Sequence, residues 1–344
     1  MNIDQQSVKR VLLTLGWTAD DRLEFSANAL PGRVSIVHGA NAEVIRCDAF
    51  GAESTALCSF ATGLDPRPVA GDWVAVRDDH IVSVAPRRTA LRRPGANPGD
   101  VQVLAANVDV VLLVLPIDRK INLRMLERLS IMAWDSGAPP AVVLTKADDA
   151  VNEVSALAET GRAVPGVAVF TTSSHSGRGI EELRDLLHEG VTAVMLGASG
   201  AGKTSLLNAL EGTVEFTRSV SRSGEGRHAT TPRKLYRLSS GGVLLDIPGI
   251  RLLDLMVGQE GLNETFADVA RLAEKCRFRD CQHSGDEGCA VEPAVASGEL
   301  TSRRLESWRA AQFEISNQER RHDSGAAPAL RRRASPSGRE PRER

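Results

Sequence analysis

A strand, a glycine-rich turn and a helix follow one another in TAVMLGASGAGKTSLLNALEG, residues 192–212. The turn, GASGAGKT, fits the pattern G-x-x-x-x-G-K-[ST], and its flanks are those that the pattern requires. Glycines let backbone N–H groups converge on phosphate oxygens, and the helix N-terminus adds partial positive charge. A plain glycine-rich connection is the alternative, but the complete pattern favours a nucleotide site in an α/β fold.

The side chains of this loop have separate expected roles. Lys203 is predicted to place its ammonium on the β- and γ-phosphates and to act in catalysis, and Thr204 to offer its hydroxyl to Mg²⁺. The predicted phosphate contacts are Gly197, Ala198, Ser199, Gly200, Ala201, Gly202, Lys203, Thr204 and Ser205. The loop alone identifies neither the base nor the reaction.

Unbroken apolar runs around this loop predict strands that are buried on both faces of a parallel sheet. These runs are 108–116, 141–145, 167–170, 192–196 and 241–246. The segments 121–137 and 180–190 have helical spacing and end at glycine. The central part of the chain is therefore predicted to be an α/β domain.

Five short β-type runs, separated by turn residues, come before this domain. They are 33–37, 42–46, 55–60, 72–76 and 80–84. Five short strands fit an oligonucleotide-binding (OB) barrel. The following segment, 86–94, holds four arginines, which predicts either a solvated basic linker or a patch that follows nucleic-acid phosphates.

Composition limits the classes of function. The net charge of −2 means that any RNA contact must be local, and the longest apolar stretch, 101–117, contains Asn107 and Asp109 and is too short to span a membrane. The N-terminus lacks a signal-peptide pattern, and three of the five cysteines crowd together at 276–289. These features predict a cytoplasmic protein with a metal site.

Two loops upstream of the phosphate loop resemble the guanine-reading loops of GTPases. Thr145, Lys146 and Asp148 form T-K-A-D after the run 141–145, similar to the N/T-K-x-D signature. In that signature the aspartate accepts hydrogen bonds from guanine, and the lysine stem lies along the base. Ser173 and Ser174 follow the next strand, where the resemblance implies a loop that reads guanine O6.

Switch-like motifs follow the phosphate loop. Asp246 and Gly249 form D-x-P-G after a buried strand, where the aspartate is expected to hold the Mg²⁺ shell and the glycine N–H the γ-phosphate. Thr230 and Thr231 lie in a polar loop between the two motifs and are further magnesium candidates, although a plain surface connection is the alternative. The order of motifs is thus the usual GTPase order rotated, which a parallel sheet permits because its site lies on loops.

A cluster of metal-ligand residues follows the switch motif. Cys276, Cys281, His283 and Cys289 have the spacing C-x4-C-x-H-x5-C. Three thiolates and one imidazole make a complete tetrahedral set for one structural Zn²⁺ ion and leave no position open for a catalytic water. Scattered cysteines beside a surface histidine are the alternative.

This combination resembles the circularly permuted, small-ribosomal-subunit-dependent GTPases of the RsgA/YjeQ/YloQ-like family. The segments that carry the likeness include GDWVAV, GASGAGKTSLLNAL, GRHATT, DIPGI and CRFRDCQHSGDEGCAV. The resemblance implies an OB barrel, a permuted GTPase domain and a zinc domain. It further implies GTP hydrolysis to GDP and phosphate in late 30S maturation, stimulation by the small subunit, and contact with 16S rRNA by a monomer.

Two positions depart from the commoner GTPase pattern. Thr145 stands where many GTPases have an asparagine that braces the base-binding loops, so guanine preference is expected to be softer. Ile250 follows Gly249 where a water-orienting glutamine is common, and His228 is the candidate for that task, with a solvated or RNA-contacting residue as the alternative. A P-loop nucleotide kinase and an RNA-binding adaptor with a structural nucleotide site are the competing functions.

The expected domain boundaries follow from the changes in composition and in apolar patterning along the chain. They are a lead-in at 1–30, an OB domain at 31–95, the GTPase domain at 96–260, a zinc-binding domain at 261–318 and a disordered basic tail at 319–344. The overall prediction is a multidomain protein with a β-barrel, a central permuted α/β P-loop domain and a helical zinc-binding domain.

Overall fold

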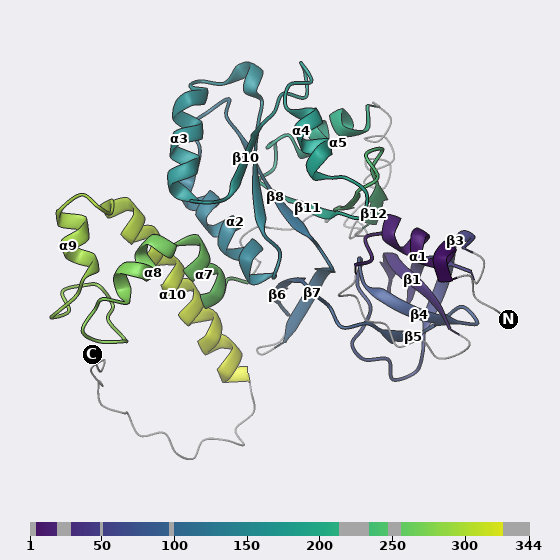
Figure 1. Ribbon diagram of the computed structural model, residues 1–344. Coiled ribbons are helices and arrows are strands. Elements are labelled where there is room, and N and C mark those ends of the chain that lie inside the picture. The colour runs from purple at the N-terminus through teal and green to yellow at the C-terminus, as the bar shows by residue number, and fades with distance from the viewer. Residues whose placement is uncertain are drawn as a thin grey trace, which may run out of the picture.

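The computed structural model describes residues 5–18, 29–48, 51–95, 100–212, 234–246 and 256–325. An N-terminal barrel, a central sheet with helices on both faces and a C-terminal group of helices lie side by side along the molecule (Figure 1). No helix among the described residues is long and apolar enough to cross a membrane.

The first part of the chain forms a closed five-stranded barrel. Its strands are β1 (Leu30–His38), β2 (Asn41–Cys47), β3 (Glu53–Phe60), β4 (Trp73–Arg77) and β5 (His80–Val84). They pair in the order β1-β2-β3-β5-β4, and a further pairing of β1 with β4 closes the barrel. The pairing of β3 with β5 is parallel and the other four pairings are antiparallel. The predicted barrel is confirmed.

A helix covers the barrel in the segment that we expected to be a polar lead-in. Helix α1 (Gln5–Thr14) and the residues after it bury Leu12 and Leu15 beside Trp73. Trp17 meets the ring of Trp73 edge to face, with ring centroids 4.8 Å apart. The apolar residues of this short helix are spaced for one face, a pattern that gives little signal in ten residues.

The central sheet has the order β10-β9-β8-β11-β13-β12. Its strands are β8 (Val110–Pro116), β9 (Pro140–Thr145), β10 (Ala168–Thr171), β11 (Thr192–Leu196), β12 (Lys234–Arg237) and β13 (Val243–Asp246). All neighbours are parallel except the antiparallel edge strand β12. The predicted buried parallel strands are confirmed.

Helices pack on both faces of this sheet. They are α2 (Leu123–Asp135), α3 (Glu153–Ala163), α4 (Ile180–Leu186) and α5 (Lys203–Glu211). Strand β8 shows the two-sided burial: Val111 and Leu113 lie in the core shared with α2, whereas Leu112 and Val114 lie in the core shared with α4 and α5. This arrangement explains why β8 is an unbroken apolar run and does not alternate.

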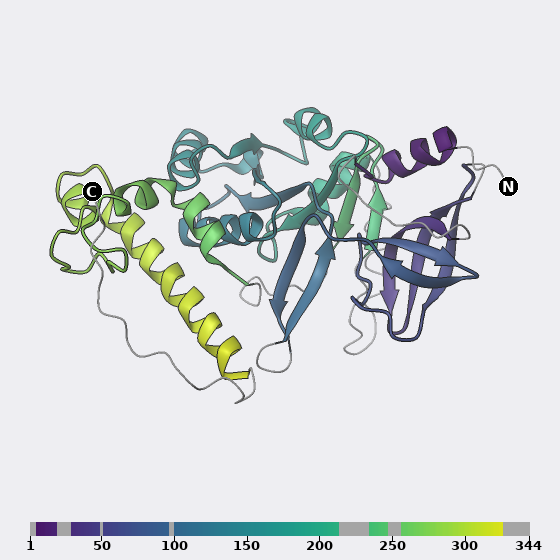
Figure 2. The same ribbon diagram turned by 60° about the horizontal axis from the view of Figure 1, so that its bottom comes forward.

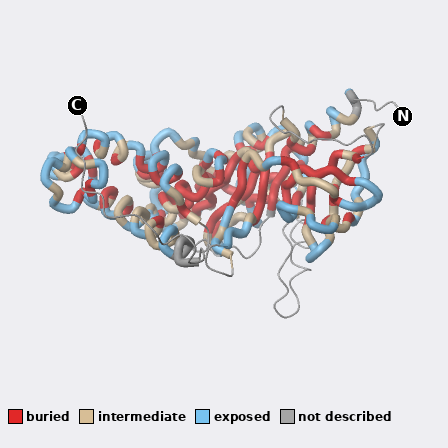
Figure 3. The backbone as a smooth tube through the Cα atoms, turned by 90° about the horizontal axis from the view of Figure 1, so that it is seen from below, coloured by how far each residue is buried: buried red, intermediate tan, exposed pale blue. Residues whose placement is uncertain are grey.

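Buried polar contacts join the barrel to the central sheet. Arg33 of β1 is fully buried, and its guanidinium donates to Thr192 Oγ1 at 2.8 Å and to Asn107 O at 3.0 Å. A β-bridge between Ile36 and Lys234 adds a backbone link, so that barrel and sheet form one eleven-stranded sheet. Buried residues gather along the middle of this joined sheet (Figure 3).

A two-stranded hairpin projects between the two ends of the molecule. It consists of β6 (Ala90–Pro94) and β7 (Val101–Ala106). Its base meets the end of α2, where the Ala90 N–H donates to Ser136 O at 2.8 Å, and its tip points away from the central sheet (Figure 2). This hairpin contains two of the four arginines of the segment 86–94, Arg92 and Arg93. The other two arginines are structural: Arg87 forms two 2.8 Å bonds with buried Asp72, and Arg88 lies 3.1 Å from Asp109. Neither a wholly solvated linker nor a free patch describes this segment.

The C-terminal helices pack along α2 (Figure 2). They are α7 (Gln259–Thr265), α8 (Ala267–Ala273), α9 (Val291–Ala296) and α10 (Ser302–Gly325). Leu262 and Phe266 belong to the same apolar core as Leu126 and Leu129 of α2. The hydrophobic core therefore continues from the central sheet into the C-terminal helices.

Ion pairs reinforce this packing. Glu127 of α2 is almost fully buried and accepts two 3.0 Å bonds from Arg303 and one 2.9 Å bond from Arg304. Arg304 also pairs with Asp268 at 2.9 Å, and its guanidinium stacks over the ring of Phe266 at 4.0 Å. Helix α2 thus provides both the apolar and the acidic contacts on which the C-terminal helices pack.

Candidate nucleotide and metal sites

The phosphate-loop residues lie where the pattern predicts. Strand β11 ends at Leu196, the loop runs from Gly197 to Gly202, and α5 begins at Lys203. Gly200 and Gly202 have φ values of +75° and +92°, which glycine adopts without steric cost. No side chain caps the start of α5, so its first backbone N–H groups are available to an anion.

The polar side chains of the loop are accessible. Thr204 and Ser205 are exposed at the first turn of α5. Lys203 arches back over the loop, and its ammonium lies 2.7 Å from Gly197 O and 3.0 Å from Ala198 O. These carbonyls hold the ammonium at the opening of the loop, where phosphate oxygens would compete for it.

Thr145 connects the predicted base loop to the phosphate loop. Its hydroxyl donates to Ala201 O at 2.6 Å, and the side chain is 2% exposed. An added Cβ on Gly202 would lie 3.3 Å from the same hydroxyl oxygen, so the two loops are closely packed. We expected threonine to weaken the brace that asparagine provides; the structure shows that the hydroxyl makes a brace. Guanine preference itself stays a prediction.

The two predicted base loops are neighbours because β9 and β10 pair in parallel. The Ser173 hydroxyl is the main influence that lowers the pKa of the exposed Asp148 carboxyl below its ordinary value. The backbone N–H of Ala147 donates to Thr172 O at 3.1 Å, and Ser174 is half-buried beside this contact. The structure therefore brings Asp148, Ser173 and Ser174 together.

Asp118 is a site residue that our sequence analysis missed. It follows β8, and its carboxylate Oδ2 lies 2.6 Å from the Lys146 ammonium. A carboxylate directly after a buried parallel strand is a usable signal, because the carboxyl ends of such strands carry the functional loops. The charged run after it, Arg119 and Lys120, hid this signal.

Part of the predicted switch lies outside the described residues. His228, Thr230, Thr231, Gly249 and Ile250 belong to this part. The backbone of Asp246 ends β13, which pairs with the strand that leads to the phosphate loop. This pairing puts the end of β13 beside the phosphate loop.

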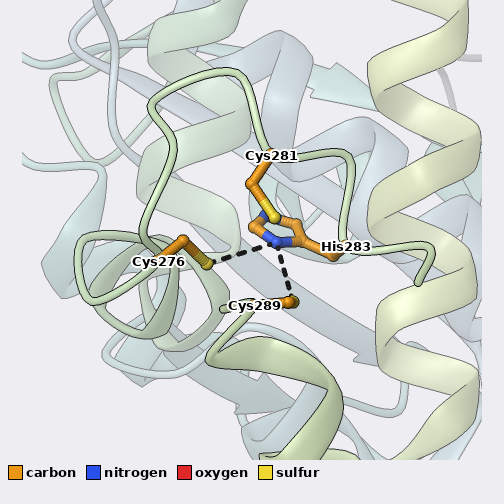
Figure 4. A group of neighbouring side chains, drawn as sticks. All are labelled: Cys276, Cys281, His283 and Cys289. Atoms are coloured by element: carbon orange, nitrogen blue, oxygen red, sulfur yellow. Dashed lines mark hydrogen bonds between the residues drawn. The ribbon is translucent and has the colours of Figure 1, made fainter. Parts of the chain in front are cut away.

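The four predicted zinc ligands converge (Figure 4). The ligand atoms of Cys276, Cys281, His283 and Cys289 all lie within 4.8 Å of one another. A Zn–S distance of 2.3 Å in tetrahedral geometry corresponds to sulfur atoms about 3.8 Å apart. The donor set and its size therefore fit one Zn²⁺ ion.

The surroundings of this cluster support metal binding. His283 Nδ1 lies 3.6 Å from the sulfur atoms of Cys276 and Cys289, and burial lowers the pKa of the ring, which favours the neutral form that ligates metals. Burial raises the pKa of the Cys281 thiol to about 12, and a divalent cation would oppose this shift by stabilising the thiolate. Trp308 of α10 covers the imidazole, with ring centroids 5.0 Å apart.

A large cavity lies elsewhere, between the barrel and the β6–β7 hairpin. Its volume is about 1030 Å³, and its lining includes His38, Phe60, Arg67, Arg93 and Gln102. The lining also holds two acidic residues, Asp65 and Asp100, and several apolar ones, so the wall of the cavity is of mixed character.

Comparisons with known proteins agree with this architecture. The RsgA GTPase family model matches residues 84–256. A small ribosomal subunit biogenesis GTPase RsgA from Streptomyces coelicolor is 41% identical over 87% of this chain and 85% of its own length. The protein of the same name from Methanosarcina acetivorans is 36% identical over 90% of this chain and 87% of its own length.

Two solved structures share the fold. YjeQ from Thermotoga maritima has a TM-score of 0.64 and 25% identity, covering 84% of this chain and 99% of its own. YloQ, described as a circularly permuted GTPase, has a TM-score of 0.61 and 23% identity, covering 86% of this chain and 98% of its own. The chain has a phosphate loop and the rotated order of loops, and the family model covers half of its length. The chain therefore belongs to the RsgA GTPase family and is a GTP hydrolase.

Proposed function

We propose that this GTPase acts in late maturation of the small ribosomal subunit in the cytoplasm, that it binds 16S rRNA as a monomer, and that the subunit stimulates its hydrolysis of GTP to GDP. The names of its curated relatives support the process. The observation that carries the nucleotide part is the 2.6 Å contact from Thr145 to Ala201, which joins the proposed guanine and phosphate loops into one site.

In the proposed site, each loop has one task. Lys203 and the backbone N–H groups of the phosphate loop bind the phosphates. Asp148 binds the guanine edge, with the Ser173–Ser174 loop beside it. Mg²⁺ would supply charge neutralisation when bound with GTP, and Thr204, in the first turn of α5, is the proposed magnesium ligand whose side chain the structure describes.

The remaining roles are proposed from the sequence. Gly249 would meet the γ-phosphate, Asp246, Thr230 and Thr231 would complete the magnesium shell, and His228 would orient the attacking water.

Two flanking elements are proposed to contact the subunit. The barrel, with the cavity beside the β6–β7 hairpin, is the proposed rRNA surface, since the cavity combines Arg67, Arg93 and Phe60. The zinc-binding region, proposed at 261–318, holds a structural Zn²⁺ ion and closes the other end of the molecule. The OB domain at 31–95 and the GTPase domain at 96–260 complete the proposed division, with 1–30 before them and 319–344 after them.

Hydrolysis measurements test this proposal. Wild-type protein should release phosphate from GTP faster with isolated small subunits than alone, and Lys203→Ala should lose both rates. His228→Ala should keep GDP affinity and lose the stimulated rate only. Equal wild-type rates with and without subunits would refute the coupling, and an ATP preference would refute the guanine assignment of Asp148.

A further inference from the structure

The loop that holds Lys146 and Asp148 is attached to the residues directly after β8. The Ile117 N–H donates to Thr145 O at 3.0 Å, and the Val151 N–H donates to Ile117 O at 3.2 Å. One residue therefore fixes the beginning and the end of the loop. The next residue, Asp118, is placed to contact the side chains that the loop presents.

Within this loop, Lys146 has an unusual backbone conformation. Its φ and ψ are 60° and 43°, in the left-handed region that L-residues other than asparagine and aspartate rarely adopt. Interactions elsewhere must stabilise this conformation. Among the described residues, the only side-chain partner of Lys146 is the Asp118 carboxylate, 2.6 Å from its ammonium.

The Lys146–Asp118 ion pair is partly buried. The Lys146 side chain is 35% exposed and that of Asp118 is 28% exposed. Oδ1, the second oxygen of Asp118, is buried and accepts no hydrogen bond from the described residues. The carboxylate is thus held in the site with Lys146 as its main charged contact.

We propose that Asp118 is a positioning residue for nucleotide binding, which it supports by anchoring the Lys146 ammonium so that the lysine stem lies ready along the base. This inference rests on the proposed guanine site. A free lysine side chain samples many rotamers and loses that freedom when a base packs on its stem. Anchoring its end in advance removes part of this cost, which is the general benefit of pre-organisation.

Arg119 supplies a matched control. Its Nε lies 3.6 Å from Asp118 Oδ1, beyond hydrogen-bond range, and its side chain is 63% exposed. Exposed ion pairs of this kind contribute little. Arg119→Gln therefore removes the other charged neighbour of Asp118 without altering the anchor of Lys146.

The test measures GDP affinity by calorimetry in a double-mutant cycle. Asp118→Asn should weaken GDP binding about tenfold, the loss expected when one pre-organised long side chain is released. In the Lys146→Met background the same change should have no further effect, because the anchored group is gone. Asp118→Glu, which keeps the charge, should bind GDP more tightly than Asp118→Asn, and Arg119→Gln should match the wild type.

Each outcome has a clear meaning. Equal affinities of wild type and Asp118→Asn would overturn the inference, as would an equal loss in the Lys146→Met background. A wild type that binds no GDP would refute the proposed function instead. Far-ultraviolet circular dichroism and a melting curve for every variant show whether a lost affinity accompanies a lost fold; a tenfold loss with an unchanged melting temperature supports positioning.

Discussion

Replacing Thr145 by valine tests whether the base loop and the phosphate loop depend on each other. Valine has nearly the same shape, so the change removes the hydroxyl that donates to Ala201 O at 2.6 Å and leaves that carbonyl without this partner. Because the side chain is 2% exposed, water cannot easily replace the bond.

The expected magnitude follows from the cost of an unsatisfied buried acceptor, about 1–3 kcal/mol. If this cost falls on the alignment of the two loops, GDP affinity should fall by a factor between about 5 and about 150. Thr145→Ser keeps the hydroxyl and should recover most of the affinity.

Thr172→Val is the control for this experiment. Its hydroxyl is also buried and donates to Leu144 O at 3.2 Å, an acceptor that lies on β9 and not in the phosphate loop. Calorimetric titration with GDP, paired with urea unfolding, separates the two effects. We expect both valine variants to lose stability and only Thr145→Val to lose affinity. Wild-type affinity in a folded Thr145→Val protein would refute the reasoning.

Two further predictions concern the C-terminal helices. Glu127→Ala leaves the buried Arg304 with one carboxylate fewer and should lower the free energy of unfolding by about 3–5 kcal/mol; a urea midpoint equal to that of the wild type would contradict this. Zinc binding should release protons at pH 7, since the pKa of Cys281 is raised to about 12 and the thiol is protonated there without the ion. Zinc affinity should therefore rise with pH. Calorimetry in buffers of different ionisation enthalpy should give different apparent binding enthalpies because the released protons are taken up by the buffer. Identical enthalpies would count against a thiolate site.

The sequence predicts the strands well where one physical pattern dominates. The run 108–116 is buried on both faces, and the barrel strands are short and separated by turns, so both could be predicted. The Cys3His cluster could be predicted because four residues within one loop need little tertiary information to meet.

Contacts between distant segments could not be predicted in the same way. The Asp118–Lys146 pair joins residues 28 positions apart, and the pairs of Glu127 span more than 170 positions. Their side chains have no local pattern that marks them as partners. Helix α1 was missed for a different reason, since ten residues offer too few turns for an apolar face to stand out.

The packing of the C-terminal helices on α2 also affects how the chain folds during synthesis. Arg303 is synthesised 176 residues after its partner Glu127. At about 5–20 residues per second, Glu127 waits roughly 10–35 s for this partner, although α7 packs on the apolar face of α2 earlier. A chain that stalls or is shortened before α10, the last of the described helices, would therefore leave the Glu127 carboxylate without its arginine partners and open to chaperones and proteases.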